Sequence, residues 1–201
     1  MARTQAADYE QRREKIVARA AQLFAERGFL GASIADLAKA CKTSKSLIYH
    51  YYSSKEEILF DVMHSHVGGL LDAAEEIALA PGDAREKLRA LTGELMQLYL
   101  GAAFRQRVLL NELVHLPKEQ RAIVVGIQRR LIEIVESLIA EIRPDISARS
   151  PFRWPTAMLY FGMINWMHTW LDPAGRAKPA RIASLAVNIF LDGIGEAEIP
   201  S

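Results

Sequence analysis

Apolar residues recur along this chain at the spacing of helix faces. Ile16, Ala20, Leu23 and Phe24 fall on one face, and Gly28 follows as a left-handed helix end. No stretch alternates apolar and polar residues as a half-buried strand would. Similar faces, separated by Gly, Pro and Ser, predict one helix ending before Gly28 and eight more over residues 33–40, 44–50, 54–80, 83–101, 104–115, 118–142, 151–171 and 179–193. The predicted fold class is all-α.

Capping residues mark two of the later boundaries. Asp83 and Glu86 form the Asp-x-x-Glu pair of a capping box, in which each side chain accepts a backbone N–H of the other residue. Ser150 followed by Pro151 predicts an N-cap and a proline at the first helical position. These signals separate the helices without any linker or repeat.

Charge is unevenly divided along the chain. The 201 residues carry a formal net charge of only +1, from 25 Lys and Arg against 24 Asp and Glu. Residues 1–55, however, hold ten Lys and Arg and five Asp and Glu, which leaves +5 there and −4 on the remainder. The small total argues against a polybasic nucleic-acid binder, whereas the basic first quarter predicts a polyanion-binding module on a larger domain.

Cysteine content and hydropathy exclude several classes of protein. Cys41 is the only cysteine, so there is no internal disulfide or cysteine-based zinc site, and we expect a small buried hydrophobe and not a redox sensor. The first twenty residues lack the apolar run of a signal peptide, and no apolar stretch has the length that spans a bilayer. We expect a cytoplasmic protein with no cofactor and no membrane partner.

Residues 33–59, SIADLAKACKTSKSLIYHYYSSKEEIL, contain two short predicted helices separated by four residues. Ser33 and Ser44 are placed as N-caps, because a serine hydroxyl accepts backbone N–H groups of the first turn. Leu37 and Ile48 lie among the apolar residues that pack the two helices together. This arrangement predicts a helix-turn-helix, whose second helix enters the major groove of DNA.

Polar and basic side chains cluster where such a helix would meet DNA. Those at its N-terminus are placed to face base edges, and those further on or beside it are placed to hold phosphates. For Tyr49 and His50 the alternative is an ordinary surface position. The predicted DNA-binding residues are Ser33, Lys42, Thr43, Ser44, Lys45, Ser46, Tyr49, His50 and Lys55.

The same segment resembles the DNA-binding domain of the TetR/AcrR family of bacterial transcriptional repressors. In that family a Tyr, then aromatic or His residues, then Lys-Glu mark the end of the recognition helix, as residues 49–52 (YHYY) and 55–56 (KE) do here. Residues 24–29 (FAERGF) and the nine-helix layout extend the resemblance over the chain. Lys42 departs from it, because the family usually has Gly in this turn. A lysine costs about 1 kcal/mol there if its φ is positive.

The resemblance implies a two-domain regulator. A three-helix helix-turn-helix domain covers residues 1–53, and a six-helix effector-binding and dimerisation domain covers residues 54–201. Such a protein is a repressor that binds a double-stranded palindromic operator as a homodimer and is released by a small molecule.

The last two predicted helices carry broad apolar stripes. In the resembled family these helices pair with their counterparts in a second subunit, and the stripes suit such a four-helix interface. Intramolecular core explains some of the same residues. The predicted dimer-interface residues are Trp166, Trp170, Ile182, Leu185, Ile189 and Phe190.

Residues 159–172 (LYFGMINWMHTWLD) and 109–112 (LLNE) resemble family members that control aromatic, steroid or fatty-acid degradation. Their effectors are commonly coenzyme A thioesters, which need an apolar slot for the acyl group and cations for the phosphates. Core packing or solvent exposure is the alternative for each candidate. The predicted effector-binding residues are Met96, Tyr99, Phe104, Arg105, Leu110, Met158, Phe161 and Asn165.

Gly68 and Gly69 interrupt the helix predicted over residues 54–80. Each Gly inside a helix costs about 1 kcal/mol relative to Ala. Either the pair is a compliant point through which ligand binding reorients the DNA-binding modules, or it permits close packing against a neighbouring helix.

Two other functions remain open from the sequence. A TetR-type sensor of hydrophobic drugs that controls an efflux pump has the same N-terminal module. A di-iron helical-bundle enzyme uses two Glu-x-x-His units and two further glutamates, and Glu112 with His115 supplies one such unit. Neither a Gly-rich phosphate loop nor a nucleophile elbow is present. We therefore predict no catalytic or metal-binding residues and no enzymatic activity.

Overall fold

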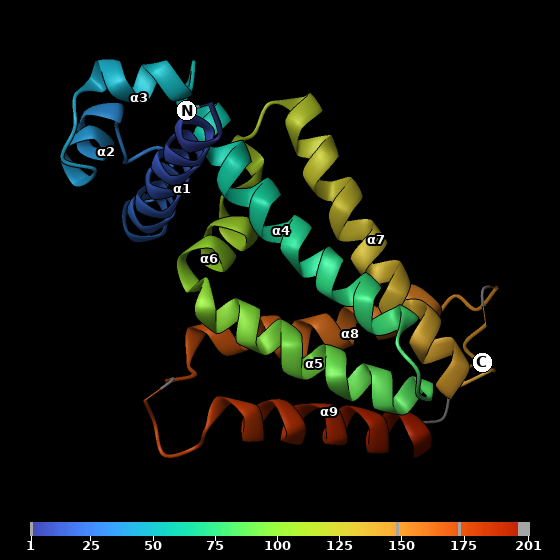
Figure 1. Ribbon diagram of the computed structural model, residues 1–201. Coiled ribbons are helices and arrows are strands. Elements are labelled where there is room, and N and C mark those ends of the chain that lie inside the picture. Colours follow the sequence, from blue (N-terminus) through green and yellow to red (C-terminus); the bar gives the residue numbers. More distant parts are fainter. Residues whose placement is uncertain (1, 148, 173, 197–201) are drawn as a thin grey trace. The chain divides into compact units, whose positions relative to one another are not determined.

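The computed structural model describes residues 2–147, 149–172 and 174–196, and the regular elements of these residues are all helices (Figure 1). The α-helices are α1 (Ala2–Arg27), α2 (Ile34–Ala40), α3 (Lys45–Tyr51), α4 (Lys55–Leu79), α5 (Ala84–Gly101), α6 (Ala103–Asn111), α7 (Lys118–Ile142), α8 (Arg153–Asn165) and α9 (Pro179–Glu196). Two 3-10 helices, η1 (Leu113–His115) and η2 (Trp166–Thr169), follow α6 and α8. The all-α prediction is confirmed. Within these residues, no helix has the length and apolar character needed to cross a bilayer.

By their contacts, the described residues form two compact units. Unit 1 holds the chain up to Val67 together with Ala102–Val125, and unit 2 holds Gly68–Gly101 together with the chain from Gly126 onward. Helices α4 and α7 each contribute to both units. The predicted domain boundary after residue 53 is a functional one, because it separates the DNA-binding helices from the effector-binding and dimerisation part. This boundary stays a prediction.

In unit 1 the two short helices begin at the predicted serines. Ser33 Oγ accepts the backbone N–H of Asp36, and Asp36 Oδ2 accepts the backbone N–H of Ser33, each at 3.1 Å, which completes a capping box. Ser44 Oγ accepts the backbone N–H of Leu47 at 3.2 Å. Ile48 is fully buried, so α3 is fixed through its inward face.

The turn between α2 and α3 has the left-handed backbone that its sequence position predicts. Lys42 has a φ of 54°, and the backbone N–H of Thr43 then donates to the Ala38 carbonyl at 2.9 Å. The positive φ costs a lysine about 1 kcal/mol relative to glycine. The Lys42 side chain is exposed beside α3.

Unit 2 is organised by α5, which packs along α9, and α8 also packs against α9 (Figure 1). The capping box predicted at the start of α5 is confirmed. Asp83 Oδ1 accepts the Glu86 N–H at 2.8 Å, and Glu86 Oε2 accepts the Asp83 N–H at 3.1 Å. The buried residues of α5 are Ala84, Leu88, Leu91, Thr92, Leu95, Met96 and Tyr99.

Two predicted helices end earlier than expected, and near each end a side chain donates to a backbone carbonyl. The Asn111 side-chain amide donates to the Arg107 carbonyl at 2.8 Å, and α6 stops there. Thr169 Oγ1 donates to the Trp166 carbonyl at 2.8 Å, and the segment after Asn165 is the 3-10 helix η2. The helices predicted over residues 104–115 and 151–171 are therefore too long.

The N-cap predicted at Ser150 is wrong. Ser150 Oγ accepts the backbone N–H of Phe152, two residues later, at 3.2 Å, which closes a local turn. Helix α8 begins only at Arg153, so Pro151 precedes the helix and does not open it.

Gly68 and Gly69 lie inside α4 with open space beside them. A Cβ added to either glycine would meet no atom within 4 Å, so close helix packing does not account for the pair. Helix α4 passes from unit 1 to unit 2 at this point, and α7 passes between the units at Gly126, where an added Cβ would also be unopposed. The compliant-point interpretation stays a prediction.

Candidate nucleic-acid interface and effector-binding residues

Helix α3 presents a polar and basic face to solvent. Lys45, Ser46, Tyr49 and His50 are all exposed, Tyr49 by 54%, while Ile48 faces the core. The spacing i, i+1, i+4 and i+5 places the four exposed side chains on one side of the helix. Of the other predicted contacts near α3, Ser33, Lys42 and Ser44 are exposed, and Thr43 is half-buried. The predicted DNA-binding side chains in and before α3 are thus largely accessible.

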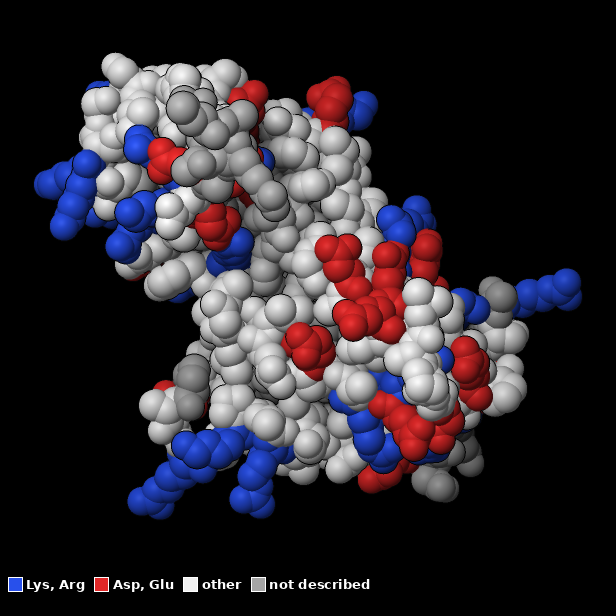
Figure 2. Space-filling view, in the orientation of Figure 1, with Lys and Arg blue, Asp and Glu red and all other residues white. Residues whose placement is uncertain are grey.

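The unit that carries this face also has Lys and Arg side chains on its surface. Figure 2 shows Lys and Arg side chains projecting from the part of the surface that covers α1, α2 and α3. The net charge of +5 on residues 1–55 therefore lies in the segment that carries the candidate interface. A positive field of this kind attracts the phosphate backbone.

The end of α3 is held by a buried polar cluster. The Tyr52 hydroxyl donates to Asp61 Oδ2, and Arg13 Nη2 pairs with Asp61 Oδ1 at 2.9 Å. Burial and the neighbouring Asp61 carboxylate raise the pKa of Tyr52, so its hydroxyl stays a donor at physiological pH. Tyr52 belongs to the core, and it ties α3 to α4 and α1.

Lys55 is bound to the protein's own backbone. Its ammonium donates to the carbonyls of Phe29 and Ala32, each at 2.9 Å, and Nζ lies 4.1 Å from the centre of the Phe29 ring. The sequence motif predicted a phosphate contact for Lys55, which stays a prediction. The structure gives this lysine a positioning role that the sequence did not reveal, because its acceptors are carbonyls more than twenty residues earlier.

Glu112 and His115 also converge on Phe29. Glu112 Oε2 accepts the Phe29 backbone N–H at 3.2 Å, and it lies 3.4 Å from His115 Nε2. The His115 ring stacks on the Phe29 ring with centroids 5.4 Å apart. The Glu-x-x-His pair is therefore occupied in fixing the turn between α1 and α2. In the described part of the chain, no three His, Cys, Asp or Glu side chains group as a metal site.

The predicted effector-binding residues divide between the two units. Met96, Tyr99 and Phe161 are buried in unit 2, on α5 and α8. Met158 and Asn165 accompany them on α8, exposed and half-buried respectively. The other three lie in unit 1 on α6 and are Phe104, Arg105 and Leu110.

Arg105 is already engaged within unit 1. Its guanidinium forms an ion pair with Glu14 of α1, so it is not a free cation for an effector phosphate. Phe104 and Leu110 are exposed on the same helix. For these three residues the described contacts favour surface and structural roles, and effector binding stays a prediction.

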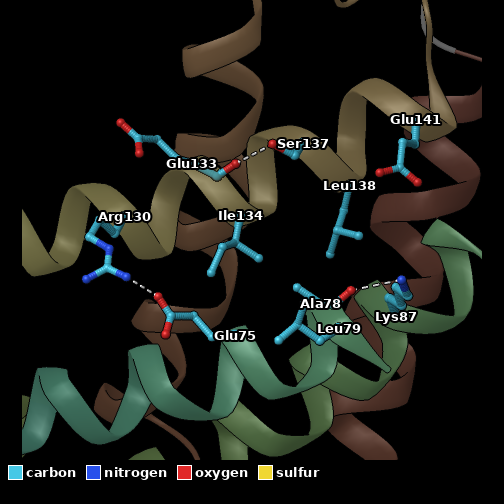
Figure 3. A pocket seen from close by; sticks show the side chains of 10 residues that line it. All are labelled: Glu75, Ala78, Leu79, Lys87, Arg130, Glu133, Ile134, Ser137, Leu138 and Glu141. Carbon is cyan, nitrogen blue, oxygen red and sulfur yellow. Dashed lines mark hydrogen bonds and ion pairs between the residues drawn. The ribbon is translucent and has the colours of Figure 1, made fainter. Parts of the chain in front are cut away.

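A groove of about 530 Å³ opens in unit 2 between the end of α4, the start of α5 and α7 (Figure 3). None of the predicted effector-binding residues lines it. Its apolar lining is Ala78, Leu79, Ile134 and Leu138. Arg130 pairs with Glu75 across it, and Lys87 Nζ donates to the Ala78 carbonyl at 2.9 Å, so both cations are occupied. Glu75, Glu133 and Glu141 also line the groove, and their carboxylates would repel the phosphates of a coenzyme A ester.

Two family models match this sequence. The model described as bacterial regulatory proteins, tetR family, matches residues 16–62, which contain the helix-turn-helix. The model described as tetracyclin repressor-like, C-terminal domain, matches residues 81–194, more than half of the chain. The chain belongs to the TetR family.

Relatives cover nearly the whole of this TetR-family chain. The transcriptional repressor KstR2 of Rhodococcus jostii is 24% identical over 185 residues, 91% of each chain. The crystal structure of a TetR-family transcriptional regulator from Bordetella parapertussis is 36% identical with a TM-score of 0.86, over 90% of this chain and 94% of that one. The structure of AibR with isovaleryl coenzyme A and operator DNA is 25% identical with a TM-score of 0.78, over 89% and 97%.

Membership of the TetR family decides the function class. The protein is a DNA-binding transcriptional regulator with an N-terminal helix-turn-helix, and not a di-iron enzyme. TetR regulators bind operator DNA and small-molecule effectors. The sequence interpretation of residues 33–59 is thereby confirmed at the level of the family, and the individual contacts stay predictions.

This TetR-family chain exposes apolar side chains along α8, η2 and α9. Among the predicted dimer residues, Leu185 and Ile189 are 55% and 59% exposed, and Trp166 and Trp170 are exposed too. Ile182 is half-buried, and so is Phe190, whose ring packs on Tyr160 at 5.4 Å. These exposed apolar side chains, on α9 and in and just after η2, are available to a partner.

Proposed function

We propose that this protein is a homodimeric repressor that binds a palindromic operator and releases it when a small-molecule effector binds. In each subunit α3 enters a major groove, where Lys45 and Ser46 face base edges and Tyr49 and His50 lie further along the helix. The proposal is carried by the exposed polar face of α3 in a chain of the TetR family. A regulator that binds operator DNA acts in the cytoplasm.

The two functions divide along the chain. Residues 1–53 read DNA, and residues 54–201 bind the effector and form the dimer. The charge supports this division, because +5 falls on residues 1–55 and −4 on the rest. Each Lys or Arg that neutralises a phosphate releases counterions, so operator affinity should fall steeply with salt concentration. An affinity independent of salt would contradict the proposed binding mode.

The effector we propose is an acyl coenzyme A thioester from a catabolic pathway. AibR, which has a similar fold, is described in complex with isovaleryl coenzyme A and operator DNA, and KstR2 is described as a repressor. An effector releases DNA only if it binds the DNA-incompetent arrangement more tightly than the DNA-bound one. The buried apolar side chains on α5 and α8, among them Met96 and Phe161, support an acyl-binding role for unit 2.

The decisive experiment screens acyl coenzyme A thioesters and the matching free acids. Each compound is first tested for a rise in the melting temperature of the purified protein, and then for release of DNA from upstream of the protein's own gene. A thioester that stabilises the protein and dissociates the DNA is the expected result. Thioesters that do neither, while the DNA itself is bound, would leave a repressor with another effector.

The groove in unit 2 favours a second candidate, a sensor of hydrophobic cationic drugs that controls an efflux pump. Glu133 and Glu141 line an apolar surface there, and both cations that line the groove are already bonded within the protein (Figure 3). An organic cation complements this lining. Stabilisation and operator release by cationic drugs, with no response to thioesters, would select this candidate.

A further inference from the structure

The hydroxyl of Tyr99, in unit 2, is a hydrogen-bond donor without an acceptor among the described residues. Tyr99 lies on the buried face of α5, and only 6% of its surface is exposed. No described residue forms a hydrogen bond with its hydroxyl. The side-chain atom of the described chain that is both sealed from solvent and unpartnered is Gln120 Oε1. The unpartnered Tyr99 hydroxyl is not such an atom, so it keeps some solvent-accessible surface. A ligand can contact it there.

The neighbouring buried tyrosine is fully satisfied by comparison. Thr92 Oγ1 donates its proton to the Leu88 carbonyl at 2.7 Å, so the Tyr160 hydroxyl, 2.9 Å from Thr92 Oγ1, must be the donor of that second bond. The two buried phenol groups thus differ in their hydrogen bonding. Tyr160 donates to a protein oxygen, and Tyr99 donates to none.

The neighbouring Tyr160 packs against aromatic rings. The Tyr160 ring meets Phe161 at 5.2 Å and Phe190 at 5.4 Å, edge to face. Burial, and secondly the nearby Tyr160, raise the pKa of Tyr99, and no Lys or Arg contributes to that pKa. Tyr99 is therefore a neutral donor throughout the physiological range. A carboxylate placed against it would lose the hydration of its charge without gaining a counter-charge. A neutral carbonyl has no charge to desolvate, so its burial costs less.

From this geometry we propose that the Tyr99 hydroxyl donates to a neutral carbonyl oxygen of the effector and thereby selects a thioester or ketone over a free carboxylate. This inference rests on the proposed effector function of unit 2 and specifies which chemistry that unit recognises. Leaving a buried donor unpaired is unfavourable, so an acceptor that arrives with the ligand gains more here than at a satisfied group. Tyr99 is a specificity residue in this interpretation.

The test compares Tyr99→Phe with Tyr160→Phe, which remove the same hydroxyl from the same interior. Three probes of equal chain length are used, octanoyl coenzyme A, octanoate and methyl heptyl ketone, and their dissociation constants are measured by calorimetry without DNA. We expect Tyr99→Phe to weaken octanoyl coenzyme A and the ketone about tenfold each, as loss of one neutral hydrogen bond does. Octanoate should bind weakly to wild type and be unaffected.

The matched variant separates recognition from folding. Tyr99→Phe should melt at or above the wild-type temperature, since it removes a donor without a partner, while Tyr160→Phe should melt lower and keep the wild-type affinities within about twofold. Equal affinity of wild type and Tyr99→Phe for the carbonyl probes overturns the proposal, and so does the absence of binding by any carbonyl probe. If only the ketone binds, and its binding depends on Tyr99, the Tyr99 hydroxyl donates to a carbonyl but the effector is not a thioester.

Discussion

The Glu112 carboxylate accepts the backbone N–H of Phe29, a residue 83 positions earlier, at 3.2 Å. Lys55 binds the carbonyl of the same Phe29 and lies over its ring, and His115 stacks on that ring. The amide, the carbonyl and the ring of one residue are thus fixed by three other side chains. Phe29 lies four residues before Ser33, the N-cap of α2. The cluster therefore fixes the turn that leads into this helix.

Glu112→Ala tests the bond to Phe29. The backbone N–H of Phe29 loses its acceptor in a part-buried position, so we expect the free energy of unfolding to fall by about 1–2 kcal/mol. Operator affinity should fall as well, because the turn that precedes α2 is released. Urea denaturation and fluorescence anisotropy with operator DNA measure the two effects.

Glu112→Gln is the matched control, because its amide oxygen still accepts the Phe29 N–H. It should retain most of the stability and the operator affinity. A Gln variant as damaged as the Ala variant would show that the negative charge, and not the hydrogen bond, holds this turn.

Two lysines near the recognition helix should respond differently to removal. Lys55→Ala breaks two bonds to backbone carbonyls and should cost about 2 kcal/mol of stability. Lys45→Ala removes an exposed side chain at the start of α3, so stability should change by less than about 0.5 kcal/mol. Its operator affinity should fall, and its preference among operator sequences should relax, because Lys45 is proposed to face base edges.

Suppose instead that Lys55→Ala keeps the wild-type stability while its operator affinity depends less steeply on salt. That result would support the phosphate contact that the motif predicts for Lys55. Stability is best followed by circular dichroism at several urea concentrations, and affinity by anisotropy between low and moderate salt.

The helix-turn-helix was predictable from sequence because its signals are local. Serine caps act within three residues, and the positive φ of Lys42 follows from a turn of fixed length. The Phe29 cluster was not predictable, because it joins residues from three distant segments. The end of α8 was missed for a different reason. Its apolar pattern continues past Asn165, and the bond from the Thr169 hydroxyl to the Trp166 carbonyl is invisible in that pattern.

Replacing Gly68 and Gly69 by Ala tests the compliant-point hypothesis. There is room for both methyl groups, and each Gly→Ala change inside a helix is worth about 1 kcal/mol, so the melting temperature should rise. If bending of α4 carries the effector signal, the stiffer helix should need a higher effector concentration to release DNA. Unchanged release in the stabilised variant would eliminate the hinge.

Stability should depend on pH through His66. Its Nε2 lies 2.8 Å from Gln106 Oε1, and burial, with a smaller effect of Arg105, lowers the pKa of His66. The unfolded chain then binds a proton at a higher pH than the folded chain does. Stability is therefore complete above the unfolded pKa of about 6.5 and is lost as the pH falls from there toward the folded pKa.

His66→Gln removes this titration. Thermal melts at intervals between pH 5 and pH 7.5 should show a smaller decline for the variant than for wild type. Equal slopes would place the acid sensitivity in other groups.

Charge on α9 should separate the subunits. Leu185 and Ile189 lie one helical turn apart and are more than half exposed, so replacing both by Glu puts two carboxylates into the proposed interface of a four-helix dimer. We expect a monomer by light scattering and a loss of operator binding, since one subunit reaches only one half-site. Leu79→Glu is the control, because Leu79 is 88% exposed at the end of α4, and its variant should stay dimeric. A dimer that survives both charges on α9 would require another surface for pairing, because two buried carboxylates on each subunit repel across a two-fold axis.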